Sequence, residues 1–194
     1  APIPLYGLGQ RISDINTLDY LAADAAKLTH QHPLGFIPAA FTAHVIYRLA
    51  SDKNPEKEIF KNYIREGLES VQRMFTEEVE KFVSLVKKAI LLSDISIDNV
   101  HAIENELGGG WIAEETVAIA IYCTLSYFDN FERAMIAAVN HAGDSDSTGA
   151  VTGNLLGAAI GYNAIPQFYK NDLELHDVIL HVADDLYLGK TTLQ

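Results

Sequence analysis

The segment that decides the fold reads His141-Ala-Gly-Asp-Ser-Asp-Ser-Thr-Gly149-Ala-Val-Thr-Gly153-Asn-Leu-Leu-Gly157-Ala-Ala-Ile-Gly161. Glycine recurs at every fourth position from 149 to 161, and in a helix such residues form a bare ridge along one side. Each glycine inside a helix destabilises it by about 0.5–1 kcal/mol relative to alanine. The pattern therefore predicts a helix that begins near Ser147 and packs closely against a neighbouring helix through its glycines.

The rest of the chain repeats apolar residues at helical spacing and shows almost no strict alternation of polar and apolar residues. We expect an all-α fold, with residues 1–194 forming a single compact multi-helix domain. A loop is expected at 7–16, and Asn16 or Thr17 is the expected cap of the helix that follows. Thr76 and Asp129 are expected to begin later helices. The expected apolar stripes lie within 18–28, 37–49, 79–90, 114–127, 129–142 and 175–186, and a more polar helix covers 55–73.

The last of these stripes consists of Leu175, Ile179, Val182 and Leu186, at the spacing of one helix face. It predicts that this helix buries that face in the core.

Composition limits the classes of partner. Of the 194 residues, 48% are hydrophobic and 21% charged, which is ordinary for a folded domain. Fourteen Lys and Arg against 26 Asp and Glu give a net charge of −12, which argues against nucleic acid and anionic membranes as partners. An anionic ligand would have to be held by helix N-termini or bound cations.

Features that report on location point to the cytoplasm. The one cysteine, Cys123, cannot form an internal disulfide, which suits a reducing compartment. Residues 1–5 lack the features of a signal peptide, and no apolar run reaches the roughly 18–20 residues of a membrane span.

The acids before the glycine ridge allow two interpretations. Asp144, Asp146, Ser147 and Thr148 stand at the expected helix start, where acids and hydroxyls commonly cap a helix and stabilise its dipole. A cap needs only one oxygen, whereas this turn brings together two carboxylates and two hydroxyls, as in sites for Mg²⁺, Mn²⁺ or Ca²⁺. The spacing alone leaves both interpretations open.

The run from Gly143 to Gly161 resembles the C-terminal signature of the ADP-ribosylglycohydrolase family, of the ADP-ribosyl-arginine and dinitrogenase-reductase-activating glycohydrolase type. Two other segments agree in order: residues 28–35 (LTHQHPLG) are similar to the family's THxxP helix end, and residues 107–115 (LGGGWIAEE) to its LGxGWxAxE loop. The family's Thr/Ser-Asp-Asp metal motif has no counterpart here. The resemblance thus implies the C-terminal two-thirds of such a protein, with the N-terminal part apparently lacking.

The resemblance implies a hydrolase that cleaves the glycosidic bond between ADP-ribose and a protein side chain or small acceptor, using a two-Mg²⁺ (or Mn²⁺) centre. It implies that Asp144 and Asp146 are catalytic and that these two acids and Ser147 are metal ligands. The expected partners are an ADP-ribosylated protein or ADP-ribose-type small molecule, and an upstream segment or chain that carries the other ligands. The residues it assigns to the ADP-ribose site are His30, Gly35, Phe36, Gly110 and Trp111.

Other interpretations remain for these residues. His30 and His32 stand at an expected helix C-terminus, where an imidazole is favourable whatever the function. Trp111 could be a core anchor or a stacking wall for a nucleotide. The chain could also be a non-catalytic remnant that binds ADP-ribose or a nucleotide, or a crystallin-like structural protein on the same scaffold. Retention of Asp144, Asp146 and Ser147 favours the hydrolase.

Overall fold

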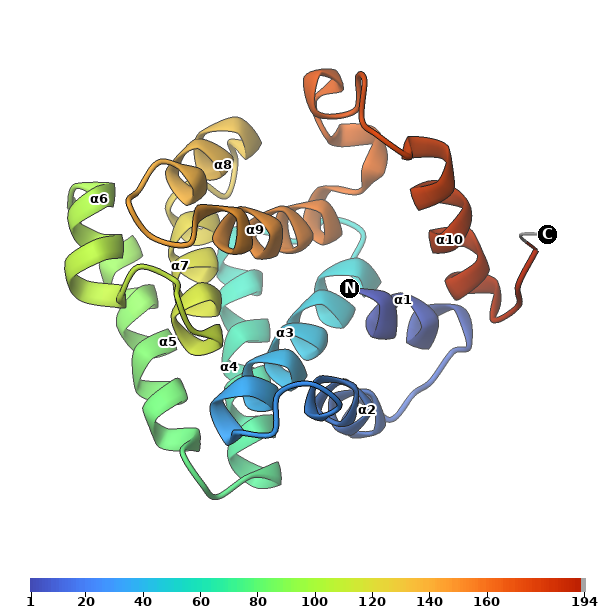
Figure 1. The fold of residues 1–194 in the computed structure, drawn as a ribbon, viewed down its shortest axis with the longest axis horizontal. Coiled ribbons are helices and arrows are strands. Elements are labelled where there is room, and N and C mark those ends of the chain that lie inside the picture. Colours follow the sequence, from blue (N-terminus) through green and yellow to red (C-terminus); the bar gives the residue numbers. More distant parts are fainter. Residues whose placement is uncertain (193–194) are drawn as a thin grey trace.

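Helix α7 (Ala113–Ser126) lies at the centre of the structure, and every residue from Thr116 to Leu125 is buried. The structure is a computed structural model that describes residues 1–192, and these residues include no β-strand (Figure 1). The expectation of an all-α fold is therefore confirmed. The other elements, in order, are α1 (Pro2–Gly9), α2 (Ile15–Lys27), α3 (Pro33–Ser51), α4 (Lys57–Met74), α5 (Val79–Ser93), α6 (Asn99–His101), the π-turn η1 (Ala102–Leu107), α8 (Phe131–Val139), α9 (Ser145–Ile160), the 3₁₀ turns η2 (Tyr162–Ala164) and η3 (Gln167–Tyr169), and α10 (His176–Leu188).

Helices α3, α5, α8 and α9 pack around α7, and α4 packs on α3 and α5. α7 and α3 are rich in apolar residues on nearly all sides, as expected for helices buried in a core. The strongly amphipathic α4 places Phe60, Ile64 and Leu68 in the core and most of its charged residues outside; the exception is Lys61, which is buried and pairs with Asp94 at 2.8 Å. The apolar stripes predicted these helices correctly. Each stripe packs against another helix of the same chain.

Several helix starts differ from the expected ones. The Asp14 carboxylate caps α2 by accepting a hydrogen bond from the backbone N–H of Asn16 at 3.1 Å, and Asn130 rather than Asp129 caps α8. α5 begins after Glu78, whose positive φ of 58° reverses the chain, and not at Thr76. α1 was not expected, because the two prolines in its first turn hide the helical pattern.

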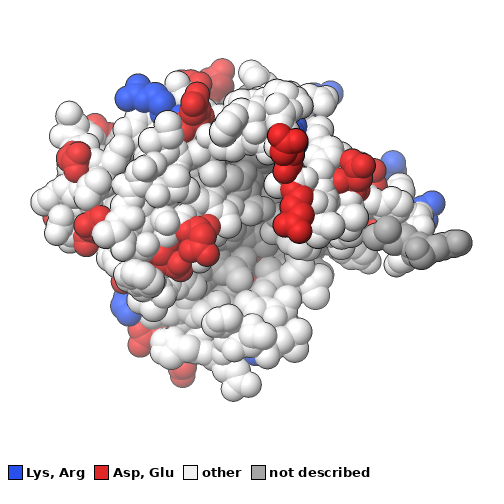
Figure 2. Space-filling model, turned by 45° about the horizontal axis from the view of Figure 1, so that its top comes forward, with Lys and Arg blue, Asp and Glu red and all other residues white. Residues whose placement is uncertain are grey.

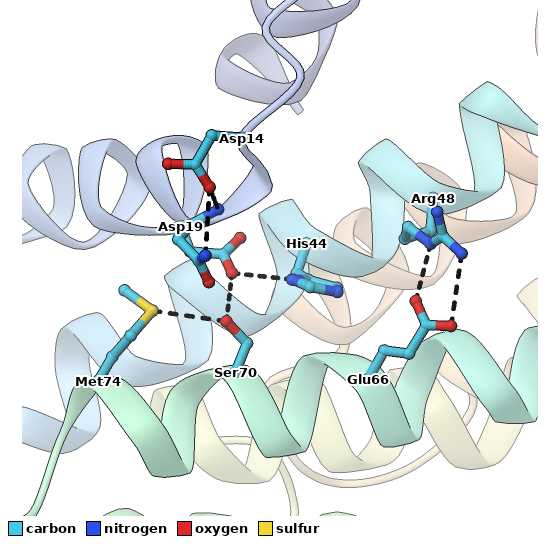
Figure 3. Close-up of polar contacts among 8 residues, drawn as sticks. Asp14, Asp19, His44, Arg48, Glu66, Ser70 and Met74 are labelled. Atoms are coloured by element: carbon cyan, nitrogen blue, oxygen red, sulfur yellow. Dashed lines mark hydrogen bonds and ion pairs between the residues drawn. The ribbon is translucent and has the colours of Figure 1, made fainter.

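A buried polar network joins three of the helices. The Asp19 carboxylate in α2 lies 2.8 Å from His44 Nδ1 in α3 and accepts a hydrogen bond of 2.6 Å from the Ser70 hydroxyl in α4 (Figure 3). Because the hydroxyl is bound to the carboxylate and not to the imidazole, the three residues are not arranged as a nucleophilic triad. They fix how α2, α3 and α4 pack.

At only one of the four positions of the α9 glycine ridge does a neighbouring side chain lie too close for any residue larger than glycine. A Cβ at Gly149 would lie 2.7 Å from Val139 Cγ1 of α8, so glycine is needed there. A Cβ at Gly153 or Gly157 would meet only side chains at 3.8 Å, and one at Gly161 would meet nothing within 4 Å. The prediction of close packing is therefore correct at Gly149 and wrong at the other three positions.

The prediction of a buried face on the last helix is also wrong. No residue of α10 is buried, and Leu175, just before it, is 64% exposed; Ile179 and Val182 are 51% and 41% exposed. α10 lies at the edge of the structure beside α1 (Figure 1). The two helices touch through Gly9, where a Cβ would overlap the carbonyl oxygen of Tyr187.

This contact yields a stability prediction. Gly9→Ala should lower the melting temperature and increase amide hydrogen exchange in α10, because the new methyl group must push the Tyr187 backbone away at a cost of about 1–3 kcal/mol. Gly153→Ala is the matched control, since its Cβ meets only ordinary contacts. Equal melting temperatures and equal exchange in α10 for the two variants would contradict the close contact. Differential scanning calorimetry and hydrogen-exchange mass spectrometry provide the two readouts.

Candidate functional site

The candidate site begins where two glycine-containing loops touch. Gly108, Gly109 and Gly110 all have positive φ (102°, 88° and 86°), a backbone conformation that side-chain-bearing residues rarely adopt. The backbone N–H of Asp144, in the loop before α9, donates to the carbonyl oxygen of Gly109 at 2.9 Å. A Cβ at Gly143 would overlap that same oxygen. Glycine at 143 thus allows the start of α9 to lie against the start of α7.

Hydrogen bonds of Thr148 and His141 fix the loop before α9 against the end of α8. The Thr148 hydroxyl donates to the Ala138 carbonyl at 2.7 Å and lies 3.0 Å from His141 Nε2. His141 Nδ1 accepts from the backbone N–H of Gly143 at 3.1 Å. The same Thr148 fills the space over Gly110, where a Cβ would lie 2.7 Å from its Cγ2. Sequence reasoning gave no role to His141, and it grouped the Thr148 hydroxyl with the possible cap or cation ligands, whereas the structure turns that hydroxyl toward the Ala138 carbonyl.

Two glutamates bind backbone N–H groups of the two loops, one glutamate for each loop. Glu104 of η1 accepts from the backbone N–H of Ala142 at 2.7 Å. Glu115 accepts from the backbone N–H of Trp111 at 3.2 Å. Burial raises the pKa of Glu115 above its ordinary value, although the N–H groups of Trp111 and Gly110 lower it in part.

A cleft of about 840 Å³ opens beside these loops. Residues of α2, α3, α7, α9 and the chain's first turn border it, and Gly35, Trp111, Asp144 and Ser147 are among them. Trp111 is 68% exposed, which rules out its being a core anchor. Figure 2 shows a face of the molecule that is hollowed at its centre, with Asp and Glu side chains at the rim of the hollow.

His30 lies in an adjoining hollow of about 430 Å³, which shares Gly35 and Trp111 with the cleft. Gly35 makes this possible, because a Cβ there would lie 2.8 Å from the Cβ of His30. The His30 imidazole is exposed, with Nδ1 2.9 Å from the Thr29 hydroxyl. His32 instead caps α3 by accepting from the backbone N–H of Leu34 at 3.2 Å.

Two residues that the resemblance assigns to the ADP-ribose site, Phe36 and Gly110, line neither the cleft nor the adjoining hollow. Phe36 points into a separate hollow, where its ring packs edge-on against Phe75 at 5.4 Å and the Lys27 ammonium lies 4.6 Å from its centre. It follows Gly35 in α3, and consecutive helical residues face about 100° apart. Gly110 is buried and lines neither hollow, so it shapes the loop without facing the cleft.

The two acids of the motif stand at the N-terminus of α9. Asp144 is its N-cap residue, yet its side chain makes no capping hydrogen bond, and Asp144 and Ser147 line the cleft. Asp146 is exposed in the first turn; a hydrogen bond with the Asp144 carboxyl group and the backbone N–H groups of residues 146 and 147 lower its pKa.

These donors suit a hard cation in kind. Two carboxylates and one hydroxyl are oxygen ligands of the sort that Mg²⁺ and Mn²⁺ take, and Mg²⁺ usually completes its six-coordinate shell with water. Within residues 1–192, no group of three or more His, Cys, Asp or Glu side chains is placed to hold a metal ion.

No helix within residues 1–192 combines the length and the apolar character needed to cross a membrane.

Comparison with known proteins identifies the family to which the chain belongs. A profile of the ADP-ribosylglycohydrolase family matches residues 1–193. The chain belongs to the ADP-ribosylglycohydrolase family.

Curated relatives within this family differ in length from the chain. ADP-ribosylhydrolase ARH3 of Homo sapiens is 24% identical over 93% of this chain and 55% of its own length, and ADP-ribosylhydrolase ARH1 of Dictyostelium discoideum is 24% identical over 89% and 55%. An uncharacterized protein of Archaeoglobus fulgidus is 30% identical over 89% of this chain and 52% of its own length. The chain spans about half the length of the curated relatives it matches.

The loop contacts yield a prediction that separates two threonines of α9. Thr148→Val keeps the side-chain shape but removes the donor to the Ala138 carbonyl, and it should destabilise the protein by about 1–3 kcal/mol. Thr152→Val is the matched control, because the Thr152 hydroxyl donates only to the carbonyl of Thr148 in its own helix. Urea unfolding followed by circular dichroism measures both. An equal loss of stability in the two variants would mean that Thr148 does not anchor the loops.

Proposed function

We propose that this chain forms the ADP-ribose cleft and half of the cation centre of an ADP-ribosyl hydrolase. The observation that carries the proposal is that Trp111, Asp144 and Ser147, from two distant motifs, line one cleft. The volume of about 840 Å³ lies within the range of about 300–1,000 Å³ typical of small-molecule sites. Two of the relatives cited above are named ADP-ribosylhydrolases, which supports the same activity class.

Two features of the cleft would bind different parts of ADP-ribose, the purine ring and the pyrophosphate. The exposed indole of Trp111 provides a flat apolar face for a purine ring. The first turn of α9 directs backbone N–H groups and the positive end of its dipole toward the cleft edge where Ser147 lies, and this suits a pyrophosphate. Locally positive groups of this kind are needed to hold a pyrophosphate because the net charge of −12 repels anions overall.

Asp144, Asp146 and Ser147 would hold Mg²⁺ or Mn²⁺ at the same helix start. Bound Mg²⁺ supplies Lewis-acid activation of a water molecule at neutral pH. Cleavage at the anomeric carbon passes through a state in which positive charge develops on the ribose, and the Asp144 carboxylate at the cleft wall would stabilise that charge. In this proposal, the remaining cation ligands come from polypeptide outside these 194 residues.

The incomplete donor set favours a second role for the chain when it stands alone. With two carboxylates and one hydroxyl in place, residues 1–194 by themselves would bind ADP-ribose and one divalent cation weakly, without turning over an ADP-ribosylated substrate. The acceptor, whether a protein side chain or a small molecule, would then be selected by the same polypeptide that supplies the remaining cation ligands.

Isothermal titration tests both parts of the proposal. Mn²⁺ should bind the wild-type chain at one weak site, and Asp146→Asn should weaken binding by at least about ten-fold because one carboxylate ligand is lost. Asp184→Asn, which removes an exposed acid on α10, is the matched control and should bind Mn²⁺ like wild type. ADP-ribose should bind wild type and quench the fluorescence of Trp111, the one tryptophan.

Equal Mn²⁺ affinity in wild type and Asp146→Asn would remove Asp146 from the cation site. Absence of any Trp111 response to ADP-ribose would remove the cleft from substrate binding. Full turnover by the 194-residue chain alone would show that the ligand set is complete without further polypeptide.

A further inference from the structure

Helix α3 carries a proline in its interior, and this proline borders the cleft of the candidate site. Proline has no backbone N–H, so Pro38 cannot donate the helical hydrogen bond to the carbonyl oxygen of Leu34, four residues earlier. Proline is also the residue that lowers helix stability most when it lies inside a helix. The chain therefore lacks one backbone hydrogen bond at the wall of the cleft.

The carbonyl oxygen of Leu34 has little access to other donors. Leu34 is only 5% exposed, which limits the contact of its backbone with bulk water. The hydroxyl group of Thr42 lies on the same helix, but it donates its one hydrogen to the carbonyl oxygen of Pro38 at 2.7 Å. Buried carbonyl groups in folded proteins nearly always have a donor, so this oxygen requires one from outside the helix.

The position of this oxygen follows from helix geometry. A helix carbonyl points along the axis toward the residue four positions later, so the Leu34 carbonyl points at the ring of Pro38. Leu34 borders the adjoining hollow that contains His30, and Pro38 borders the main cleft. Gly35 and Trp111 border both spaces. The free acceptor therefore lies at the junction of the two spaces, which it shares with the indole of Trp111.

An unpaired acceptor at this junction favours a ligand whose ring edge carries an N–H donor. The proposed function places a purine ring against the face of Trp111, which leaves the edge of the purine free for hydrogen bonds. Adenine has an amino group on that edge, whereas hypoxanthine has a carbonyl oxygen at the same position.

We propose that the carbonyl oxygen of Leu34, freed by Pro38, accepts a hydrogen bond from the adenine amino group and makes the cleft selective for adenine nucleotides over their hypoxanthine counterparts. This inference rests on the proposed function and specifies the base that the cleft accepts.

Two nucleotides that differ at this edge of the base test the inference in the wild-type chain. ADP-ribose and inosine diphosphate ribose share their ribose and pyrophosphate groups, but the second presents an oxygen to the Leu34 carbonyl. ADP-ribose should bind at least about ten-fold more tightly, because two acceptors that face each other both stay unpaired. Quenching of the fluorescence of Trp111, the one tryptophan, measures both affinities.

Pro38→Ala supplies the N–H that the Leu34 carbonyl lacks, so the acceptor is used within the helix. The preference for ADP-ribose should fall to about two-fold or less, and the new N–H at residue 38 should be protected from amide exchange. Pro33→Ala is the matched control. Pro33 stands in the first turn of α3, where no helical carbonyl depends on its N–H, so the preference should stay as in wild type.

Equal affinity of the wild-type chain for the two nucleotides would overturn this inference alone, because the Leu34 carbonyl would then bind a group that both share, such as a ribose hydroxyl. An unchanged preference in Pro38→Ala, or an unprotected N–H at residue 38, would also overturn it. Absence of any Trp111 response to either nucleotide would overturn the proposed function as well, so the two failures are distinguishable. The wild-type comparison needs no variant and decides the matter if Pro38→Ala does not fold.

Discussion

The hydrogen bond from the Asp144 backbone N–H to the Gly109 carbonyl is the contact on which the candidate site depends. It exists because Gly143 carries no side chain: a Cβ there would overlap the carbonyl oxygen. Gly109 needs its own freedom to turn at positive φ. This contact brings together two segments far apart in sequence, and with them Trp111 and the acids that begin α9.

The position of α9 explains how a strongly acidic chain can present a site for an anion. Its N-terminus lies at the cleft, where backbone N–H groups and the helix dipole provide local positive potential. The buried helix α7 holds the other loop, so the cleft is built on two helix starts and rests on the core. The C-terminal half of α9 borders a second, separate hollow of about 500 Å³.

The sequence predicted what depends on patterns completed within the chain. The apolar stripes within 37–49 and 114–127 predicted the helices that the structure shows as α3 and α7. The residues from Asp144 to Thr148 predicted acids and hydroxyls at a helix start, and the family resemblance placed them at a ligand site. Periodicity shows that a helix has an apolar or bare face but not what covers it, and for this reason the predictions of a buried α10 face and of close packing at Gly153, Gly157 and Gly161 were wrong. Phe36 lies in a different hollow from Gly35 because neighbours in sequence do not share a helix face.

The candidate site depends on the coupling of the two glycine loops, and amide hydrogen exchange in Gly143→Ala measures that coupling most directly. Exchange should accelerate by at least about ten-fold at Asp144 and also at Trp111, across the contact, while the buried amides of α7 stay protected. Gly153→Ala, on the same helix, should leave both loops unchanged. Faster exchange confined to residues 140–144, with Trp111 protected as in wild type, would show that the loops are held independently and would contradict the account.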